Sequence, residues 1–432
     1  MENRYDKYKD SGIAWIGEIP EHWKIIPHKR IMRKKKIIKE YYAGENILSL
    51  TKKGVIIRDL EAGGKMPTTF NGYQILYPDN LLMCLFDIDV TPRCVGVIKN
   101  EGLSSPSYSQ FVLNQLGYTP FFDYLLRYMD DEKCLLHLSK NLRNSLTEDD
   151  FGQIETIVPP TQEQQSIATY LDQKCSEIDE LITLQEEMIT KLQSYKQSVI
   201  TEAVTKGLDK NVPLKDSGIE WIGEIPEHWE ISKTLFSLSM PITDGPHTTP
   251  ELFETGIPFV SAEAVSFGNG RIDFSRIRGY ISENFYQECC KKYVPQVDDI
   301  YMIKSGATTG RIAMVDTDVK FTIWSPLAVF RCNKERMLPR FLFYQLQSNG
   351  YQKQIELNWS YGTQQNIGMR TLEKLMLSVP SLPEQQSIAT YLDQKCSEID
   401  ALISIKQQKI EKLKDYKKSL IFECVTGKRK VS

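Results

Sequence analysis

Apolar residues recur every seven positions in a long stretch near the middle of the chain. One row consists of Leu171, Ile178, Leu192 and Val199, and a companion row consists of Leu181, Met188 and Tyr195. A seven-residue apolar period sustained over several turns is typical of a coiled-coil helix. The pattern predicts a helix of about 40 residues, which at 1.5 Å per residue spans ~60 Å.

The C-terminal stretch repeats this pattern. Its first row consists of Leu392, Ile399, Leu413 and Leu420, its second of Leu402 and Tyr416, and it has Lys406 and Lys409 where the first copy has Gln185 and Met188. Prolines precede both stretches and Gly207 and Gly427 follow them, as expected at helix ends. Two matching helices in one chain are expected to pack together as antiparallel coiled-coil spacers. The alternative is that each helix packs on its own domain.

Two segments of the chain recur almost unchanged. Residues 9–23 (KDSGIAWIGEIPEHW) return at 215–229 with Ala14 replaced by Glu220, and residues 163–179 (EQQSIATYLDQKCSEID) return without change at 384–400. Repetition of this kind indicates two fused half-proteins. Each half has a short motif, a variable block and a long helix, so the sequence predicts a pseudo-two-fold internal repeat.

The variable blocks share an order of features but almost no identity. Short runs of Val, Ile and Phe, broken by Gly, Asn and Asp, indicate mixed α/β domains with short strands. The expected fold class is α/β (α+β), with two globular mixed domains separated by two long helical spacers. The expected divisions are a repeat motif at 1–23, a first variable domain at 24–158, a central helix at 159–208, a second motif and linker at 209–229, a second variable domain at 230–379 and a C-terminal helix at 380–432.

Composition narrows the classes of protein. The formal net charge of -3 argues against coating nucleic acid by bulk electrostatics, so any basic surface must be local. The 9 cysteines include no C-x-x-C pair, which favours a reducing cytoplasm. The first ten residues are polar, and no apolar run approaches the roughly 18 residues of a membrane span. We expect a soluble cytoplasmic protein without a membrane partner.

No catalytic, cofactor or metal pattern stands out. The sequence lacks a G-x-x-x-x-G-K-[ST] phosphate loop, a glycine-rich dinucleotide fingerprint and an Asn/Asp-Pro-Pro-aromatic signature. Asp87 and Asp89 alternate like a strand edge, and Asp79, Asp131 and Lys133 resemble a nuclease motif. Because Asp131 lies in an acidic turn after a predicted helix, solvated charges explain all five better. His22 and His228 occupy one repeated position, which favours a structural role. No Cys/His set has zinc spacing.

Three groups of motifs carry a family resemblance. S-G-I-x-W-I-G-E-I-P-E-H-W precedes each variable block, P-x-x-E-Q-Q-S-I-A-x-Y-L-D opens the first helix, and the second block contains T-D-G-P-H-T-T-P at 243–250 and S-G-A-T-T-G-R at 305–311. Over essentially its full length the chain resembles the specificity subunit of type I restriction-modification systems. The first block lacks clear counterparts of the last two segments, and Ser381-Leu382-Pro383 replaces Pro160-Thr161-Gln162 at the second helix.

The resemblance implies a non-catalytic subunit that reads an asymmetric two-part target on double-stranded DNA. Each variable block would be a target-recognition domain for one half-site, and the helices would fix the gap between half-sites. The partners implied are two methyltransferase (modification) subunits and the restriction/translocase subunits. S-adenosylmethionine, ATP and magnesium would belong to those partners and not to this chain.

Candidate DNA contacts are basic residues for phosphates and polar loop residues for base edges. In the first block they are Lys34, Lys35, Lys65, Thr68, Thr69, Arg93, Ser107, Tyr108, Ser109 and Gln110. In the second they are His247, Thr248, Thr249, Lys304, Thr308, Arg311, Tyr361, Gln364 and Gln365. The alternative for each is a solvated loop residue, and for His247 a histidine satisfied by local hydrogen bonds. The near-neutral charge predicts weak DNA binding by the isolated subunit.

The outward helix faces also recur, which predicts that one partner surface docks twice. The repeated set is Gln164, Gln165, Thr169, Asp172, Gln173 and Glu177 with their second copies, and the docking candidates are Gln165, Thr169, Gln386 and Thr390. A solubilising face or a recent gene duplication would also give this identity. Two rival classes remain open, a self-contained endonuclease or methyltransferase and a coiled-coil adaptor that does not bind DNA.

Overall fold

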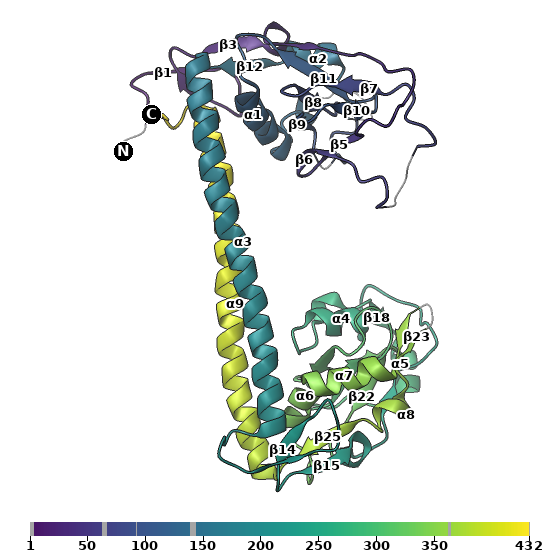
Figure 1. Ribbon diagram of the computed structural model, residues 1–432. Coiled ribbons are helices and arrows are strands. Elements are labelled where there is room, and N and C mark those ends of the chain that lie inside the picture. The colour runs from purple at the N-terminus through teal and green to yellow at the C-terminus, as the bar shows by residue number, and fades with distance from the viewer. Residues whose placement is uncertain (1–3, 63–66, 92, 139–143, 362–363, 432) are drawn as a thin grey trace. The chain divides into compact units, whose positions relative to one another are not determined.

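The computed structural model describes residues 4–62, 67–91, 93–138, 144–361 and 364–431 (Figure 1). The chain divides into two compact units, Met1–Gln185 with Gln408–Ser432 and Glu186–Gln407. Each unit holds one mixed α/β domain and part of each of two long helices, α3 (Thr161–Lys206) and α9 (Leu382–Val425). The predicted fold class is confirmed.

The first unit is built on a four-stranded antiparallel sheet of order β4-β11-β8-β9, with the pairs β12-β3, β10-β7, β5-β6 and β1-β2 beside it. Its strands are β1 (Tyr8–Asp10), β2 (Glu18–Pro20), β3 (Lys24–Pro27), β4 (Met32–Lys34), β5 (Leu48–Thr51), β6 (Gly54–Ile57), β7 (Gln74–Leu76), β8 (Leu81–Met83), β9 (Val95–Val97), β10 (Gly102–Ser104), β11 (Ser109–Leu113) and β12 (Glu155–Val158). Its helices are η1 (His28–Arg30), α1 (Thr119–Asp131), η2 (Leu136–Leu138) and α2 (Glu148–Gln153).

The second unit has a four-stranded sheet of order β16-β22-β19-β20, a three-stranded sheet β18-β17-β21 and the pairs β15-β25, β13-β14 and β23-β24. Its strands are β13 (Leu214–Asp216), β14 (Glu224–Pro226), β15 (Glu230–Lys233), β16 (Thr243–Asp244), β17 (Ile257–Val260), β18 (Tyr280–Ile281), β19 (Ile300–Ile303), β20 (Ile312–Met314), β21 (Thr322–Ile323), β22 (Leu327–Phe330), β23 (Ser360–Tyr361), β24 (Gln365–Asn366) and β25 (Met376–Val379). Its helices are η3 (Thr234–Ser237), α4 (Ala262–Phe267), η4 (Phe274–Arg276), α5 (Glu283–Cys290), α6 (Pro339–Gln347), α7 (Asn349–Asn358) and α8 (Met369–Leu372).

The two domains share one scaffold. Their four-stranded sheets have the same antiparallel order, and α1 and α6 follow the last strand of each sheet. The backbone N–H of Tyr118 donates to Gln164 Oε1 at 2.7 Å, and that of Leu338 donates to Gln385 Oε1 at 2.8 Å. Because Gln164 and Gln385 are the same repeated position, α1 and α6 begin at equivalent places. Each domain is thus tied to the first turn of a long helix by a buried glutamine.

The repeated opening motif contacts the first turn of the same helices. His22 lies 2.6 Å from Glu163, and the indole N–H of Trp23 donates to Glu163 at 3.0 Å. In the second copy His228 lies 2.8 Å from Glu384, and Trp229 donates to Glu384 at 3.3 Å. These contacts give the repeated histidine the structural role that the sequence predicted.

The two long helices pack together in antiparallel directions within each unit. In the first unit Lys417 donates to both carboxylate oxygens of Asp179 at 2.7 Å, and in the second unit Lys196 makes the same contact with Asp400. The two ion pairs occupy equivalent repeat positions. The paired arrangement predicted from the apolar pattern is therefore correct.

One of the two predicted apolar rows is wrong by one residue at Leu181 and Tyr195, whereas Met188 of that row is half-buried and contacts Lys406 at 3.1 Å. Leu171, Ile178 and Val199 are buried as expected, but Leu181 and Tyr195 are 43% and 57% exposed, and their copies Leu402 and Tyr416 are 48% and 51% exposed. The second row of the interface is Cys175, Ile182, Ile189, Lys196 and Ala203. Leu181 and Ile182 lie three and four residues after Ile178, on neighbouring faces of the helix, and both are apolar. Only the partner helix therefore selects which of them enters the interface. Gln185 is buried in this interface, whereas Lys409 is exposed.

Within the described ranges, no helix has the length and apolar character needed to cross a membrane.

Candidate nucleic-acid interface

Two loops occupy equivalent places in the two domains. In the first, Met83 pairs with Val95, and the β8–β9 loop spans 84–94. In the second, Met302 pairs with Ile312, and the β19–β20 loop lies between them. Each loop leaves the same hairpin of the four-stranded sheet. The sequence segment S-G-A-T-T-G-R therefore has a structural counterpart in the first domain, although its residues differ.

Each loop also packs on an equivalent neighbouring segment. The N–H of Leu146 donates to the Leu85 carbonyl at 2.8 Å, and the N–H of Ile367 donates to the Lys304 carbonyl at 2.9 Å. We call these neighbours the first loop pair (described residues of 84–94 with 144–146) and the second loop pair (304–311 with 364–367). Loops held on a rigid sheet are common carriers of binding residues.

The second loop pair brings together several predicted contacts. The N–H of Gly306 donates to the Gln365 carbonyl at 2.9 Å, which joins the loop to the β23–β24 hairpin. Arg311 is exposed and donates to the Ser266 carbonyl at 3.0 Å, while Thr308 accepts from the Ser266 hydroxyl at 3.0 Å. Gln364 is exposed, Gln365 half-buried, and Tyr361 pairs with Gln365 through the backbone. Donors and acceptors are thus concentrated at one edge of the sheet.

A buried carboxylate, that of Asp244, contacts side chains of the second loop pair and of the neighbouring segment 245–249. Asp244, 1% exposed, contacts Lys292, lies 3.3 Å from Lys304 Nζ and 3.2 Å from His247 Nε2. Burial alone would raise the pKa of Asp244, but Lys292 and Lys304 outweigh it and lower that pKa below its usual value. The charged carboxylate fixes the start of the loop that exposes His247, Thr248 and Thr249.

A polar cavity of about 630 Å³ lies beside the second loop pair, between α6 and the helices α3 and α9. Arg311, Arg271, Arg340 and Lys196 line it. Arg340 contacts Asp393 at 2.5 Å and Lys196 contacts Asp400, so two of the four cations have carboxylate partners in the cavity wall. The other two cations also have partners, since Arg271 lies 3.4 Å from Asp316 and Arg311 donates to the Ser266 carbonyl.

The first domain places its candidates less compactly. Lys34 is exposed and contacts Glu148, and the Lys35 ammonium lies 3.4 Å from the centre of the Tyr77 ring. Ser107, Thr68 and Thr69 are exposed, and the half-buried Tyr108 ring stacks on Phe86 with centroids 6.0 Å apart. Lys65 lies outside the described residues.

Ser109 and Gln110 have internal roles. Gln110 has no exposed surface, and its side chain accepts from the N–H of Tyr77 at 2.8 Å and donates to the Ile75 carbonyl at 3.0 Å. Ser109 is 6% exposed and donates to Glu148 at 2.8 Å. Because these groups are already satisfied inside the domain, we leave both residues out of the proposed interface.

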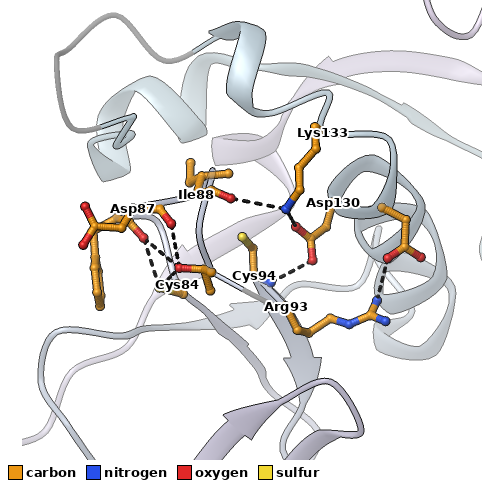
Figure 2. A network of polar contacts seen from close by, with 10 residues as sticks. Cys84, Asp87, Ile88, Arg93, Cys94, Asp130 and Lys133 are labelled. Atoms are coloured by element: carbon orange, nitrogen blue, oxygen red, sulfur yellow. Dashed lines mark hydrogen bonds and ion pairs between the residues drawn. The ribbon is translucent and has the colours of Figure 1, made fainter. Parts of the chain in front are cut away.

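A polar network anchors the first loop to the end of α1 (Figure 2). Asp130 accepts from the N–H of Cys94 at 2.8 Å, and Lys133 donates to the Ile88 carbonyl at 3.3 Å. Arg93 lies 3.5 Å from Asp131, with only 18% of its side chain exposed, so it is largely enclosed behind the loop. Sequence reasoning treated Asp87 and Asp89 as solvated charges and did not identify this loop. In the sequence, the apolar runs that end at Met83 and Met302 occupy corresponding places in the two blocks, and this is a signal that could have found the loop.

The docking candidates on the helices are accessible. Gln165, Thr169, Gln386 and Thr390 are all exposed. Gln164, by contrast, is buried and donates to the Pro159 carbonyl at 2.8 Å, so its assignment to the outward face was wrong. Asp172 accepts from the Tyr124 hydroxyl at 2.8 Å and therefore also serves its own domain.

Among the described residues, no group of three or more His, Cys, Asp and Glu side chains is arranged to hold a metal ion.

The model of the type I restriction modification DNA specificity domain matches residues 246–415. The chain is 27% identical to the putative type I restriction enzyme MjaX specificity subunit of Methanocaldococcus jannaschii, over 96% of each chain. It is 26% identical to the MjaVIII specificity subunit of the same organism, over 65% of this chain and 63% of that protein.

Solved structures share the fold. A chain in the structure titled "Structural basis underlying complex assembly and conformational transition of the type I R-M system" matches with a TM-score of 0.69 at 16% identity, over 94% of this chain and 98% of that one. The HsdS subunit from Thermoanaerobacter tengcongensis matches with a TM-score of 0.52 at 15% identity, over 95% and 98%. With the repeated motifs and the two equivalent domains, these matches make the chain similar, over nearly its full length, to the specificity subunits of type I restriction-modification enzymes.

Proposed function

We propose that this chain reads an asymmetric, two-part double-stranded DNA target, with one domain for each half-site. The observation that carries the proposal is the pair of equivalent loops, which leave the same hairpin of each sheet and present different side chains. Arg311 is exposed on the second loop, and Asp87 and Asp89 are exposed on the first. Because base edges are distinguished by their donors and acceptors, loops of different chemistry select different half-sites.

We further propose that the paired helices dock two copies of a methyltransferase subunit, followed by restriction/translocase subunits. The exposed Gln165 and Thr169 recur as Gln386 and Thr390. Large apolar side chains are also exposed at repeated positions, Leu181 with Leu402, Leu184 with Ile405 and Tyr195 with Tyr416. Exposed apolar residues that recur on two equivalent surfaces favour partner contact over a purely solubilising role.

The chemistry then belongs to those partners. We propose that this chain is not catalytic, that S-adenosylmethionine, ATP and magnesium bind the partner subunits, and that the complex works in the cytoplasm, where the nine free cysteines stay reduced.

The test is methylome sequencing in a methylation-free host that expresses the chain with its methyltransferase subunit, compared with the methyltransferase alone. We expect methylated adenines in one asymmetric two-part motif only when the chain is present. A chain-independent methylation pattern, with expression of both proteins verified, would contradict the reading role and support the adaptor alternative.

Docking is tested separately by co-purification. Gln165→Arg and Gln386→Arg together should lower the amount of methyltransferase bound per chain, and each alone should remove about one copy. Lys210→Glu, an exposed change in the linker after α3, serves as the control. Unchanged stoichiometry in the double variant would contradict docking at these residues.

A further inference from the structure

The two recognition loops differ in chemistry at equivalent positions. Lys304 and Leu85 share the same backbone contact with the neighbouring segment, and Arg311 and Cys94 directly precede the returning strand. The second loop therefore has cationic side chains where the first has Leu85 and Cys94, which are 5% and 0% exposed. Cationic contact at those two positions is not available to the first loop.

What the first loop exposes is acidic and apolar. Phe86, Asp87, Asp89 and Val90 are exposed, with Val90 at 72%. Ile88, between the two aspartates, has no exposed surface. Its side chain is directed into the domain, while its neighbours are exposed on either side.

Hydrogen bonds to neighbouring segments of the first domain hold the loop in this conformation (Figure 2). The N–H of Ile88 donates to the Asn144 carbonyl at 3.1 Å, and its carbonyl accepts from Lys133 at 3.3 Å. The hydroxyl of Thr91 donates to the Asp87 carbonyl at 2.7 Å. These hydrogen bonds fix the loop before it binds. Its exposed side chains therefore lose little further conformational entropy on binding.

An exposed carboxylate near DNA is repelled by phosphates unless it accepts a hydrogen bond from a base. In the major groove the partner of Asp and Glu is the N4 amino group of cytosine, whereas Arg and Lys donate to guanine. Building on the proposed function, we infer that the first loop reads a cytosine in the first half-site and that the Asp89 carboxylate accepts from its N4 amino group. Asp89 is thus a specificity-determining residue that the motifs do not reveal.

The experiment uses the full chain in complex with its methyltransferase subunit. Methylomes and competition binding, with duplexes substituted at each position of the motif, are compared for wild type, Asp89→Asn and Glu101→Gln. Glu101 is an exposed carboxylate of the same domain, between β9 and β10, so its variant controls for the loss of one negative charge. We expect Asp89→Asn to reduce discrimination at one cytosine of one half-site by at least about fivefold, and to leave the other half-site unchanged.

Four results would contradict the inference. Asp89→Asn acting like Glu101→Gln, with equal effects on all sequences, would make Asp89 a solvated charge. Relaxed recognition at a base other than cytosine would contradict the base assignment. A wild-type chain that confers no motif would contradict the proposed function itself, whereas an intact motif that is insensitive to Asp89→Asn contradicts this inference alone.

Discussion

Gly12 and Gly427 have similar positive φ angles but different surroundings. Comparing alanine substitutions at the two positions therefore separates the cost of backbone strain from the cost of a steric clash. Gly427 has φ 73°, and a Cβ there would lie 2.4 Å from Pro20 Cδ, in the contact between the end of α9 and the opening motif. Gly12 has φ 70° and open space around it. We expect Gly12→Ala to cost about 1 kcal/mol of unfolding free energy and Gly427→Ala at least about 2 kcal/mol.

Urea denaturation of the two variants provides the measurement. Equal losses of stability would show that the end of α9 does not pack tightly on the opening motif.

Asp244 predicts a pH dependence of stability. Its pKa in the folded chain lies below the usual value, because Lys292 and Lys304 outweigh the effect of burial. A lowered carboxyl pKa stabilises the fold above the unfolded pKa of about 3.9, and this contribution is lost as pH falls through the folded value. The stability difference between wild type and Asp244→Asn should therefore be large at pH 7 and shrink as pH falls below about 4.

Denaturant unfolding at several pH values checks this. Asp318→Asn, an exposed carboxylate of the same domain, serves as the control. A difference between wild type and Asp244→Asn that stays constant with pH would contradict the role given to the two lysines.

Among the elements, the paired helices allow a direct test of the corrected interface. Ile399 is 4% exposed and Leu402, three residues later, is 48% exposed. We expect Ile399→Ala to cost about 2–4 kcal/mol and Leu402→Ala less than about 1 kcal/mol. Thermal unfolding followed by circular dichroism checks the order. A larger effect at Leu402 would restore the row that the sequence pattern suggested.

The same helices show how far sequence reasoning reaches. The period of seven and the exact repeats were enough to predict two long antiparallel helices. They could not choose between Leu181 and Ile182, because both are apolar and the choice depends on the partner helix. Gln164 was misassigned for a similar reason, since a glutamine that satisfies buried backbone groups has the same sequence pattern as one that faces solvent.

The loops show the corresponding limit for the candidate interface. The second loop carries polar residues in a recognisable motif, so Thr308 and Arg311 were predicted from the sequence. The first loop shares only its place on the sheet, which becomes visible when Met83 pairs with Val95 as Met302 pairs with Ile312. Similarly, Gln110 looked like a loop residue but lies in β11 with its amide buried.

At the scale of the whole molecule, charge limits how tightly the chain alone can bind DNA. The net charge is -3, and many basic side chains near the candidate loops have acidic partners, such as Lys34 with Glu148 and Lys292 with Asp244. Phosphate contacts release counterions and dominate the salt dependence of affinity. Where such cations are already paired with carboxylates, the chain should release fewer counterions on binding, and its affinity should depend on what its partners add.

We expect the isolated chain to bind its target in the nonspecific range, with Kd weaker than ~10⁻⁶ M at physiological salt, and the complex with methyltransferase subunits to reach ~10⁻⁸ M or tighter. The slope of log affinity against log salt should be steeper for the complex, because each added phosphate contact contributes about 0.9 to it on duplex DNA. Fluorescence anisotropy at several salt concentrations, with a scrambled duplex as control, measures both quantities. Tight, sequence-specific binding by the chain alone would mean that its own side chains supply the phosphate contacts. The partners would then contribute catalysis without increasing the affinity for DNA.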